Sequence, residues 1–499
     1  MKKLIYRFLA AALALSAAMS CHDFLQEDPK GQFMSASYFN TVEDVQTALA
    51  RMVYNSMDYY YEGKCLNMAC RLADDICASN YKVLEVFQQS DGEQYVFTNW
   101  ENCYESIKQA NFILSLDGTV EGDEATLKQY MGMAYFYRGY AYYNLVRFYK
   151  QMPIITDIDP HPDIKSSTQQ AVWDQVVSDI TKAEELLPTS WGESVMRLEA
   201  PTVASAKAVL AEAYLNMAGY PYNGGKPYYQ KAADKAKEVI NGNYGVGFDT
   251  YDNIWNNKPD QISKEALLAY VYIDSSTEKN ALINCFMPAE YSGWYWFMPE
   301  KGFFRDFPEG PRKEATFYTT IKTPSGDKAW DDPSRSVPLP VYRKMIQTPA
   351  MNYDEDPWNN DDWRYDGKEI ALRYTQTACT YAEAIARATG SPDALAYDLM
   401  DQIRQRAGLP VYARNLSGDA FATLVVQERA WEMAGEFTRY SDLCRLQMVE
   451  EIHNKRGSDE LVGSDYTGTP TKDTYYLPVP ASEVLLNKNL LEIETGTTE

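Results

Sequence analysis

The chain has 499 residues, of which 45% are hydrophobic and 23% are charged. It is therefore long enough to form two or more packed lobes, and too apolar to be globally disordered. Its formal net charge of −23 excludes a nucleic acid as the expected partner, because the phosphate backbone would be repelled. Aromatic residues make up 13% of the chain, more than a core alone needs, so some rings are expected at a surface.

The first 20 residues have the pattern of a signal peptide. Lys2, Lys3 and Arg7 precede an apolar run that is too short to be a permanent membrane span. The small residues just before Cys21 predict bacterial lipoprotein processing, which would leave Cys21 as a lipidated N-terminus. The alternative is plain secretion with an incidental cysteine. Removal of the three basic residues would change the formal charge from −23 to −26.

Helices are expected soon after the tether. Thr41 caps a helix predicted over 41–62, and two more are predicted over 98–116 and 125–150. The helix over 125–150 carries many tyrosines and small residues, which would let a neighbouring helix approach closely. Pro153 should end this helix, because proline has no N–H to donate.

Alanine-rich helix pairs follow between residues 167 and 242. Thr202 is expected to cap a helix that ends at Gly219. Pairs of this length and composition resemble tetratricopeptide hairpins, and similar pairs recur from residue 372 onward. We therefore predict a mainly α fold with a scaffold of about four tetratricopeptide-like helix pairs.

Residues 243–371 differ in character from both flanking parts. A strand is predicted over 266–274, and then Pro, Gly, Asp and Trp crowd together without a sustained period. A long irregular insertion in a compact protein is usually functional. We expect a single unit over 21–499, made of a helical part (21–242), this loop-rich insertion and a C-terminal helical part (372–499). The chain should close with an extended piece, a short helical turn and a packed tail.

Six segments stand out in order along the chain: CHDFLQEDPKGQF, AYFYRGYAYYNLVRFYKQMPII, RYTQTACTYAEAIARATG, ALAYDLMDQIRQRAGLP, QERAWEMAGEFTRYSDLCRL and YYLPVPASEVLLNKNL. Together they resemble the SusD/RagB-like family of outer-membrane nutrient-binding lipoproteins over nearly the whole chain. Each motif is unspecific alone, whereas the ordered set is strong. Lys150 and Phe437 stand where glycine is common, Asp401 replaces the usual Asn, and a terminal Asn-Pro-Gly-Tyr is missing. These departures affect local turns and the tail.

The resemblance implies a surface lipoprotein that binds a glycan without cleaving it. Its partner would be a SusC-like TonB-dependent outer-membrane barrel, over which this protein acts as a lid. The residues agree on the absence of catalysis: His22, His161 and His453 have no Ser or Cys partner in local sequence. Two carboxylates could still hydrolyse a sugar, but among 70 acidic residues such pairs are inevitable. We expect no enzyme activity and no cofactor.

The best candidate for sugar binding is the run from Tyr291 to Phe297, with five aromatics in seven residues between two prolines. Pyranose rings stack their C–H faces on aromatic planes, and Gly293 would let the backbone project a ring outward. By resemblance, Trp294 lies in the ligand-facing region and is the first choice, followed by Trp296 and Tyr291. The alternative is that some of these rings anchor the loop on the scaffold.

A second candidate follows the first helices, where family members also place ligand-contacting residues. It contains Asp74, Asn80 and Tyr81; alternatively, Asp75 caps a helix and Tyr81 is a core residue. A further set of acids and arginines is expected to form structural ion pairs, with ligand contact as the alternative. That set is Glu383, Glu428, Arg429, Glu432, Arg439, Asp442 and Arg445.

Metal and disulfide signals are weak. One disulfide among Cys65, Cys70, Cys77 and Cys103 is conceivable in an oxidising compartment, but most of these cysteines are expected to be small buried side chains. A group of aspartates could hold calcium, yet it lacks EF-hand spacing, so we expect solvated acids and no metal site. The group is Asp354, Asp356, Asp361, Asp362 and Asp366.

We predict a non-catalytic glycan-binding lipoprotein, anchored on the cell surface at the outer membrane through Cys21. The alternatives are a binder of peptide or glycopeptide in the same kind of uptake system, a helical glycoside hydrolase, and an adaptor that binds only protein.

Overall fold

The computed structural model describes most of the chain between Phe39 and Glu494. The described ranges are 39–58, 73–78, 90–92, 94–192, 199–256, 261–272, 281–323, 325–346, 367–457, 459–460 and 469–494. Within them the protein is mainly helical, and its strands form only two-stranded pairs. No helix among these residues is long and apolar enough to cross a membrane.

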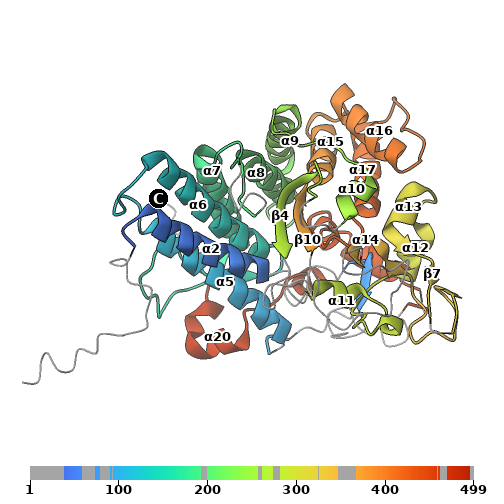
Figure 1. Ribbon diagram of the computed structural model, residues 1–499, viewed down its shortest axis with the longest axis horizontal. Coiled ribbons are helices and arrows are strands. Elements are labelled where there is room, and N and C mark those ends of the chain that lie inside the picture. Colours follow the sequence, from blue (N-terminus) through green and yellow to red (C-terminus); the bar gives the residue numbers. More distant parts are fainter. Residues whose placement is uncertain are drawn as a thin grey trace, which may run out of the picture.

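The N-terminal part is a stack of long helices (Figure 1). It contains α2 (Val42–Asp58), α5 (Gln94–Leu114), α6 (Glu124–Val146) and α7 (Gln169–Leu186), in which each helix packs on the next. Helix α6 is buried on nearly all sides from Tyr130 onward, as its mixture of aromatic and small residues predicted.

Two details of α6 follow from its sequence. A side chain on Gly139 would place its Cβ 2.8 Å from Ile180 Cδ1, which confirms that α7 approaches at a small residue. The predicted stop at Pro153 is wrong, however, because α6 ends at Val146 and the chain turns into β2 (Gln151–Met152) before the proline is reached. β2 pairs with β3 (Ser167–Thr168), and this short hairpin leads into α7.

The stack continues through α8 (Val203–Ala218) and α9 (Gly225–Asn241). Thr202 caps α8 as predicted, in a reciprocal capping box with Ser205. The next helix of the stack, α15 (Tyr374–Thr389), packs directly on α9, although the insertion separates the two in sequence. Helices α16 (Ala394–Arg406) and α17 (Gly418–Glu432) then close this end around an alanine-rich core. These helix pairs have the predicted tetratricopeptide-like arrangement.

The insertion lies beside the helical stack and is built from short elements (Figure 1). The predicted strand is present as β4 (Ala266–Tyr272), which pairs antiparallel with β10 (Gly367–Arg373) and so brings the chain back to α15. Strand β1 (Ile76–Ala78), from the N-terminal part, pairs with β5 (Phe297–Pro299). Two further pairs are β6 (Phe317–Tyr318) with β9 (Val341–Tyr342), and β7 (Thr320–Ile321) with β8 (Lys328–Ala329). The other elements here are α10 (Tyr251–Trp255), α11 (Leu282–Phe286), η3 (Ala289–Tyr291), α12 (Lys301–Asp306), α13 (Pro311–Thr316) and α14 (Arg343–Ile346).

The C-terminal segment packs back on the N-terminal helices. The short helices α18 (Arg439–Arg445), α19 (Val449–Lys455) and η4 (Lys472–Thr474) precede an extended stretch, in which the Leu477 N–H donates to the Phe148 carbonyl at 2.7 Å. Helix α20 (Ala481–Leu486) and η5 (Lys488–Leu491) follow. This confirms the predicted extended piece, helical turn and packed tail.

The acids and arginines of the C-terminal helices form buried ion pairs. Arg445 binds Glu383 at 2.6 Å and Asp442 at 2.8 Å, and all three side chains are at most 3% exposed. A second group joins the insertion to the helices: Arg312 binds Glu428 at 2.7 Å. The predicted structural role is therefore confirmed. Leaving one partner of such a pair unpaired typically costs about 3–5 kcal/mol of stability.

Cys77 and Cys103 are buried, which confirms the prediction of small core side chains for these two, and Cys285, Cys379 and Cys444 are buried as well. Cys21, Cys65 and Cys70 lie outside the described residues, as do the five aspartates considered for calcium. Among the residues that are described, no group of His, Cys, Asp and Glu is arranged to hold a metal.

Candidate functional site

The aromatic loop between α11 and α12 is shaped by local backbone constraints. Ser292 and Tyr295 adopt positive φ values of 60° and 49°. Gly293 lies against the carbonyl of Met287, where a Cβ would come within 2.2 Å of the oxygen. Only glycine allows this close approach, which fixes the backbone of the adjacent residues Ser292 and Trp294.

Three of the five rings in this loop anchor it. Tyr291 and Tyr295 are each 2% exposed, and Phe297 is fully buried in β5. The Tyr295 hydroxyl lies 3.0 Å from the Leu339 carbonyl and 2.8 Å from that of Pro340, so it ties the loop to the chain ahead of β9. The burial of Tyr291 favours the alternative stated above, that this ring anchors the loop on the scaffold, and ligand contact at Tyr291 stays an untested prediction.

Trp294 and Trp296 are the partly exposed rings of the loop. Their ring centroids are 4.6 Å apart and their planes differ by 28°, so the two indoles stack. Their backbone is held from behind, because the Trp294 N–H donates to the Asn284 carbonyl at 2.8 Å. We refer to Trp294 and Trp296 as the indole pair. A fixed aromatic surface of this kind is suited to the C–H face of a sugar ring.

The second predicted segment lies beside this loop. In the β1–β5 pair Ile76 is opposite Pro299 and Cys77 is opposite Met298, so residues far apart in sequence meet next to the indole pair. Asn80 and Tyr81 lie outside the described residues. The start of the second segment, 74–78, therefore lies beside the aromatic loop, the other region in which the resemblance implied ligand contacts.

Asp74 is engaged in a structural ion pair. The Arg439 Nε and Nη2 atoms donate to its two carboxylate oxygens at 2.7 and 3.0 Å. Burial by itself would raise the pKa of Asp74, but the guanidinium more than offsets this and holds the pKa below its usual value. Asp74 thus fastens β1 to α18, and because its side chain is 18% exposed, ligand contact at Asp74 stays a prediction.

Asp75, its neighbour, is a buried carboxyl that is 1% exposed. It accepts one hydrogen bond from the backbone N–H of Gly435, at 2.9 Å. Burial raises the pKa of Asp75 to about 7; the Gly435 N–H partly offsets this rise and the nearby Asp74 adds to it. The alternative that Asp75 caps a helix is wrong, because Gly435 lies beyond the C-terminus of α17.

Phe437 explains one departure from the family pattern. It keeps a positive φ of 61°, the conformation for which the usual glycine is suited. Its ring packs against Phe286 and Phe297, with centroids 5.9 and 5.7 Å away. The aromatic side chain thus supports the base of β5.

Ion pairs hold the remaining sides of the loop. Buried Arg335 donates to Glu290 at 3.0 Å and to the Leu339 carbonyl at 2.8 Å. Arg456 pairs with Glu300 and donates to the Ala73 carbonyl at 2.7 Å. The carboxylates closest to the indole pair in sequence are therefore each bound to an arginine.

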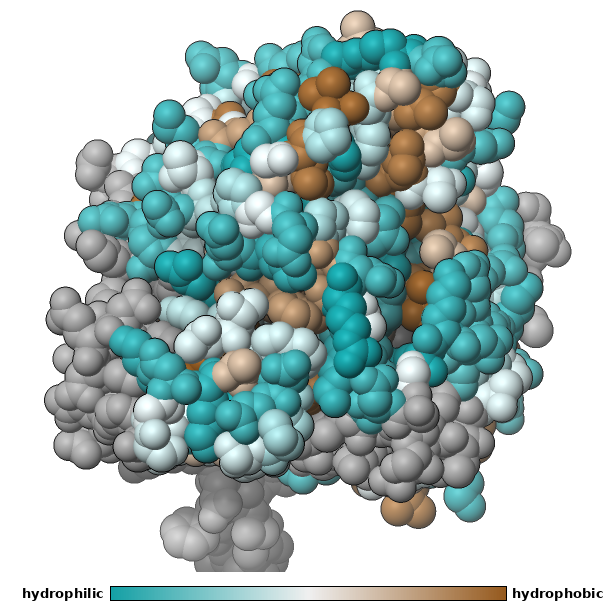
Figure 2. All heavy atoms as spheres, turned by 90° about the vertical axis from the view of Figure 1, so that its right-hand side faces the viewer, coloured by the Kyte–Doolittle hydropathy of each residue, from teal (hydrophilic) through white to brown (hydrophobic). Residues whose placement is uncertain are grey.

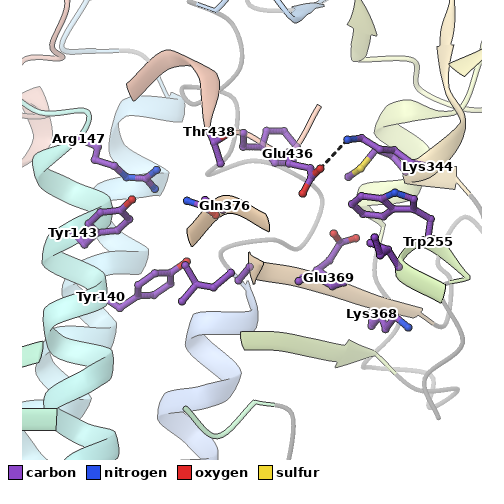
Figure 3. Close-up of a pocket in the computed structure, with 16 residues that line it drawn as sticks. Tyr140, Tyr143, Arg147, Trp255, Lys344, Lys368, Glu369, Gln376, Glu436 and Thr438 are labelled. Carbon is purple, nitrogen blue, oxygen red and sulfur yellow. Dashed lines mark hydrogen bonds and ion pairs between the residues drawn. The ribbon is translucent and has the colours of Figure 1, made fainter. Parts of the chain in front are cut away.

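A separate cavity of about 50 Å³, lined by both polar and apolar side chains, lies where the insertion meets the helical stack (Figure 3). On one side lie Tyr140 and Tyr143 of α6 and Arg147, the residue that follows this helix. On the other side lie Trp255, Lys344 and Glu369. This volume has room for a few water molecules. We call it the junction cavity.

Glu369 is the unusual group of the junction cavity. Burial raises its pKa to about 8, and the negative charge of Glu436 raises it further in the same direction. Glu436 itself is paired with Lys344 at 2.7 Å, as drawn in Figure 3. Sequence reasoning missed Glu369; a glutamate inside the short strand GKEIALR was the only available signal.

Comparison with known proteins places this architecture. Residues 23–215 match a family model described as starch-binding and associating with the outer membrane, and residues 291–495 match the SusD family. SusD-like protein P2 of Formosa agariphila is 25% identical, covering 99% of this chain and 100% of its own.

Solved structures share the fold. A SusD superfamily protein from Parabacteroides distasonis superposes with a TM-score of 0.76 at 23% identity, covering 90% of this chain and 98% of its own. A structure described as a laminarin-binding SusD-like protein gives a TM-score of 0.72 at 22% identity, covering 92% of this chain and all of its own. With two matching family models that together span most of its length, the chain belongs to the SusD/RagB-like family.

Proposed function

We propose that the protein is a cell-surface lipoprotein that captures an oligosaccharide and delivers it to a SusC-like TonB-dependent outer-membrane barrel. The observation that carries the proposal is the indole pair, stacked at 4.6 Å on a loop whose other rings are buried. Family membership and the relative described as laminarin-binding support a glycan as cargo.

Capture relies on a surface that is formed before the ligand arrives. The loop is fixed by Tyr295, by Gly293 against Met287 and by the β1–β5 pair. Little conformational entropy of the loop is then lost when a ligand binds. In this proposal Trp294 makes the principal contact with the sugar, and Trp296 stacks on Trp294 and supports it.

The proposal includes no cleavage of the glycan. A glycosidase needs two carboxyl groups that face one sugar across an open site. Asp74, Glu290 and Glu300 are each paired with an arginine, and Asp75 is enclosed. The ion pairs and the burial make these four acids poorly suited to act as a nucleophile or a proton donor.

Cys21 would carry the lipid in this account, with the following residues as its tether. The described chain begins beside the first helices, where the Phe39 ring meets Phe112 at 4.9 Å. Seventeen residues separate Cys21 from Phe39, and such a stretch spans at most about 60 Å when extended. Mass spectrometry of the membrane-extracted protein, with Cys21→Ser as control, tests the anchor.

A glycan array probed with the whole chain carrying Cys21→Ser tests the cargo, and co-purification with a TonB-dependent barrel tests delivery. Binding of peptides but of no glycan would favour the alternative cargo. Turnover of an oligosaccharide by the purified protein would favour the glycoside hydrolase instead.

A further inference from the structure

A cleft of about 380 Å³ lies between α10 and α13, and Trp255 lines both this cleft and the junction cavity. Its volume is within the range of roughly 300–1,000 Å³ that is typical of small-molecule sites. Tyr251 and Trp255 line it, one turn apart on α10, so both rings lie on the same side of that helix. Trp255 is only 8% exposed, so partly exposed Tyr251 is the main aromatic surface of the cleft. Figure 2 shows the side of the molecule that carries α13, where hydrophilic side chains predominate and the surface is hollowed between them.

The two rings are held by the buried ion network. The Tyr251 hydroxyl donates to Glu432 at 3.2 Å, and the Arg406 guanidinium lies 4.8 Å from the centre of the tyrosine ring. Lys344 Nζ lies 4.9 Å from the centre of Trp255. Both aromatic planes are therefore fixed from the protein side before any ligand arrives, as in a preorganised binding site.

The polar groups of the cleft suit hydroxyl groups. Asp252 and Glu314 are exposed, and within the described residues neither carboxylate accepts a hydrogen bond. Arg343 is partly buried and donates to the Glu314 carbonyl at 3.1 Å. Asp249, by contrast, already accepts from Asn253 and from the Lys264 N–H. Carboxylates and guanidinium groups around an aromatic pair can together hydrogen-bond a polyol and stack on its C–H face.

We infer that this cleft is a second saccharide site, distinct from the indole pair, that holds one or two neutral pyranose units. The choice of saccharide as ligand class rests on the proposed function. The lining carries three carboxylates, Asp249, Asp252 and Glu314, against the two guanidinium groups of Arg343 and Arg406. A negative excess repels uronic acids and sulfated sugars, so the site selects uncharged units.

The test uses the whole chain with Cys21→Ser and with the indole pair removed by Trp294→Ala and Trp296→Ala. Saturation-transfer NMR is recorded with the methyl glycosides of glucose, galactose, mannose and xylose, and with methyl glucuronide. We expect at least one neutral glycoside to bind and the glucuronide to bind more weakly. Adding Asp252→Asn and Glu314→Gln should weaken binding about tenfold, which corresponds to about 1.4 kcal/mol.

Both added substitutions affect exposed side chains, so folding should be preserved. Asp306→Asn, an exposed acid on α12, is the matched control and should leave binding unchanged. If the variant without the indole pair does not fold, the same comparison is made in the otherwise wild-type chain. The inference is overturned if no neutral glycoside binds, or if binding is insensitive to Asp252→Asn with Glu314→Gln. The proposed function is contradicted by a different result: the whole chain with Cys21→Ser and an intact indole pair binds no glycan on the array.

Discussion

Asp75 offers a quantitative test of how the candidate site is held. Its carboxyl is buried next to β1, and its pKa is raised from 3.8 to about 7. A group whose folded-state pKa is raised stabilises the fold fully below its unfolded pKa, and this contribution is lost as the pH rises through the folded value. Stability should therefore decrease between about pH 4 and pH 7, because the unfolded chain releases this proton first.

The magnitude follows from the shift. A difference of about 3 units corresponds to about 4 kcal/mol at pH 8, where folding must bury a carboxylate. Asp75→Asn removes the ionisation, and its amide oxygen can still accept from the Gly435 N–H. The variant should match the wild type near pH 4 and become more stable than it by up to about 4 kcal/mol at pH 8.

The assay is urea unfolding at half-unit steps from pH 4 to pH 8, followed by tryptophan fluorescence. The slope with urea must be equal in both proteins, so that the midpoints report stability. Asp306→Asn, on the exposed side of α12, is the control and should show no pH-dependent difference from the wild type. A difference between Asp75→Asn and the wild type that is constant with pH, or that falls as the pH rises, would refute the reasoning.

Three further substitutions test other parts of the account. Because the pKa of Glu369 is raised to about 8, its ionisation should cause a second decrease in stability between about pH 4.5 and pH 8, and Glu369→Gln should remove this decrease. At pH 8.5 the variant should be more stable than the wild type by about 2 kcal/mol, which is less than the full pKa shift implies because the side chain is only partly buried. Glu383→Gln leaves buried Arg445 short of a counter-charge and should cost about 3–5 kcal/mol at pH 7 in urea unfolding. Glu451→Gln, which removes only an exposed pair with Lys455 on α19, should cost far less. Gly293→Ala forces a Cβ toward the Met287 carbonyl, so it should lower oligosaccharide affinity, measured by calorimetry, more than Gly247→Ala does, where a Cβ would meet open space. Equal effects of the two substitutions would contradict the role of Gly293.

Local signals in the sequence predicted much of the fold. Thr202 was recognisable as a cap because its hydroxyl can bond the backbone N–H of Ser205 within one turn. The end of α6 was misplaced because Pro153 acts only where a helix would otherwise continue, and the pairing of β2 with β3 had already turned the chain. That pairing is a tertiary contact, which local sequence does not specify.

The candidate site was predicted only in part, for a similar reason. Composition identified the aromatic loop, but which rings face outward depends on distant partners. Tyr295 is fixed by carbonyls of the segment before β9, and Asp74 by Arg439, more than 300 residues away. Trp294 and Trp296 stay partly exposed, and the aromatic composition of the run does not distinguish them from the three buried rings.

The central claim, that the indole pair binds the cargo, is tested most directly by calorimetric titration of Trp294→Ala. The ligand is the oligosaccharide that binds the wild-type chain best on the array, and the control is Trp191→Ala, a partly buried tryptophan of the helical stack. The account predicts that Trp294→Ala weakens binding at least tenfold, which is about 1.4 kcal/mol, with the unfolding midpoint nearly unchanged, and that the control keeps its affinity. Unaltered affinity in a folded Trp294→Ala variant would contradict the account.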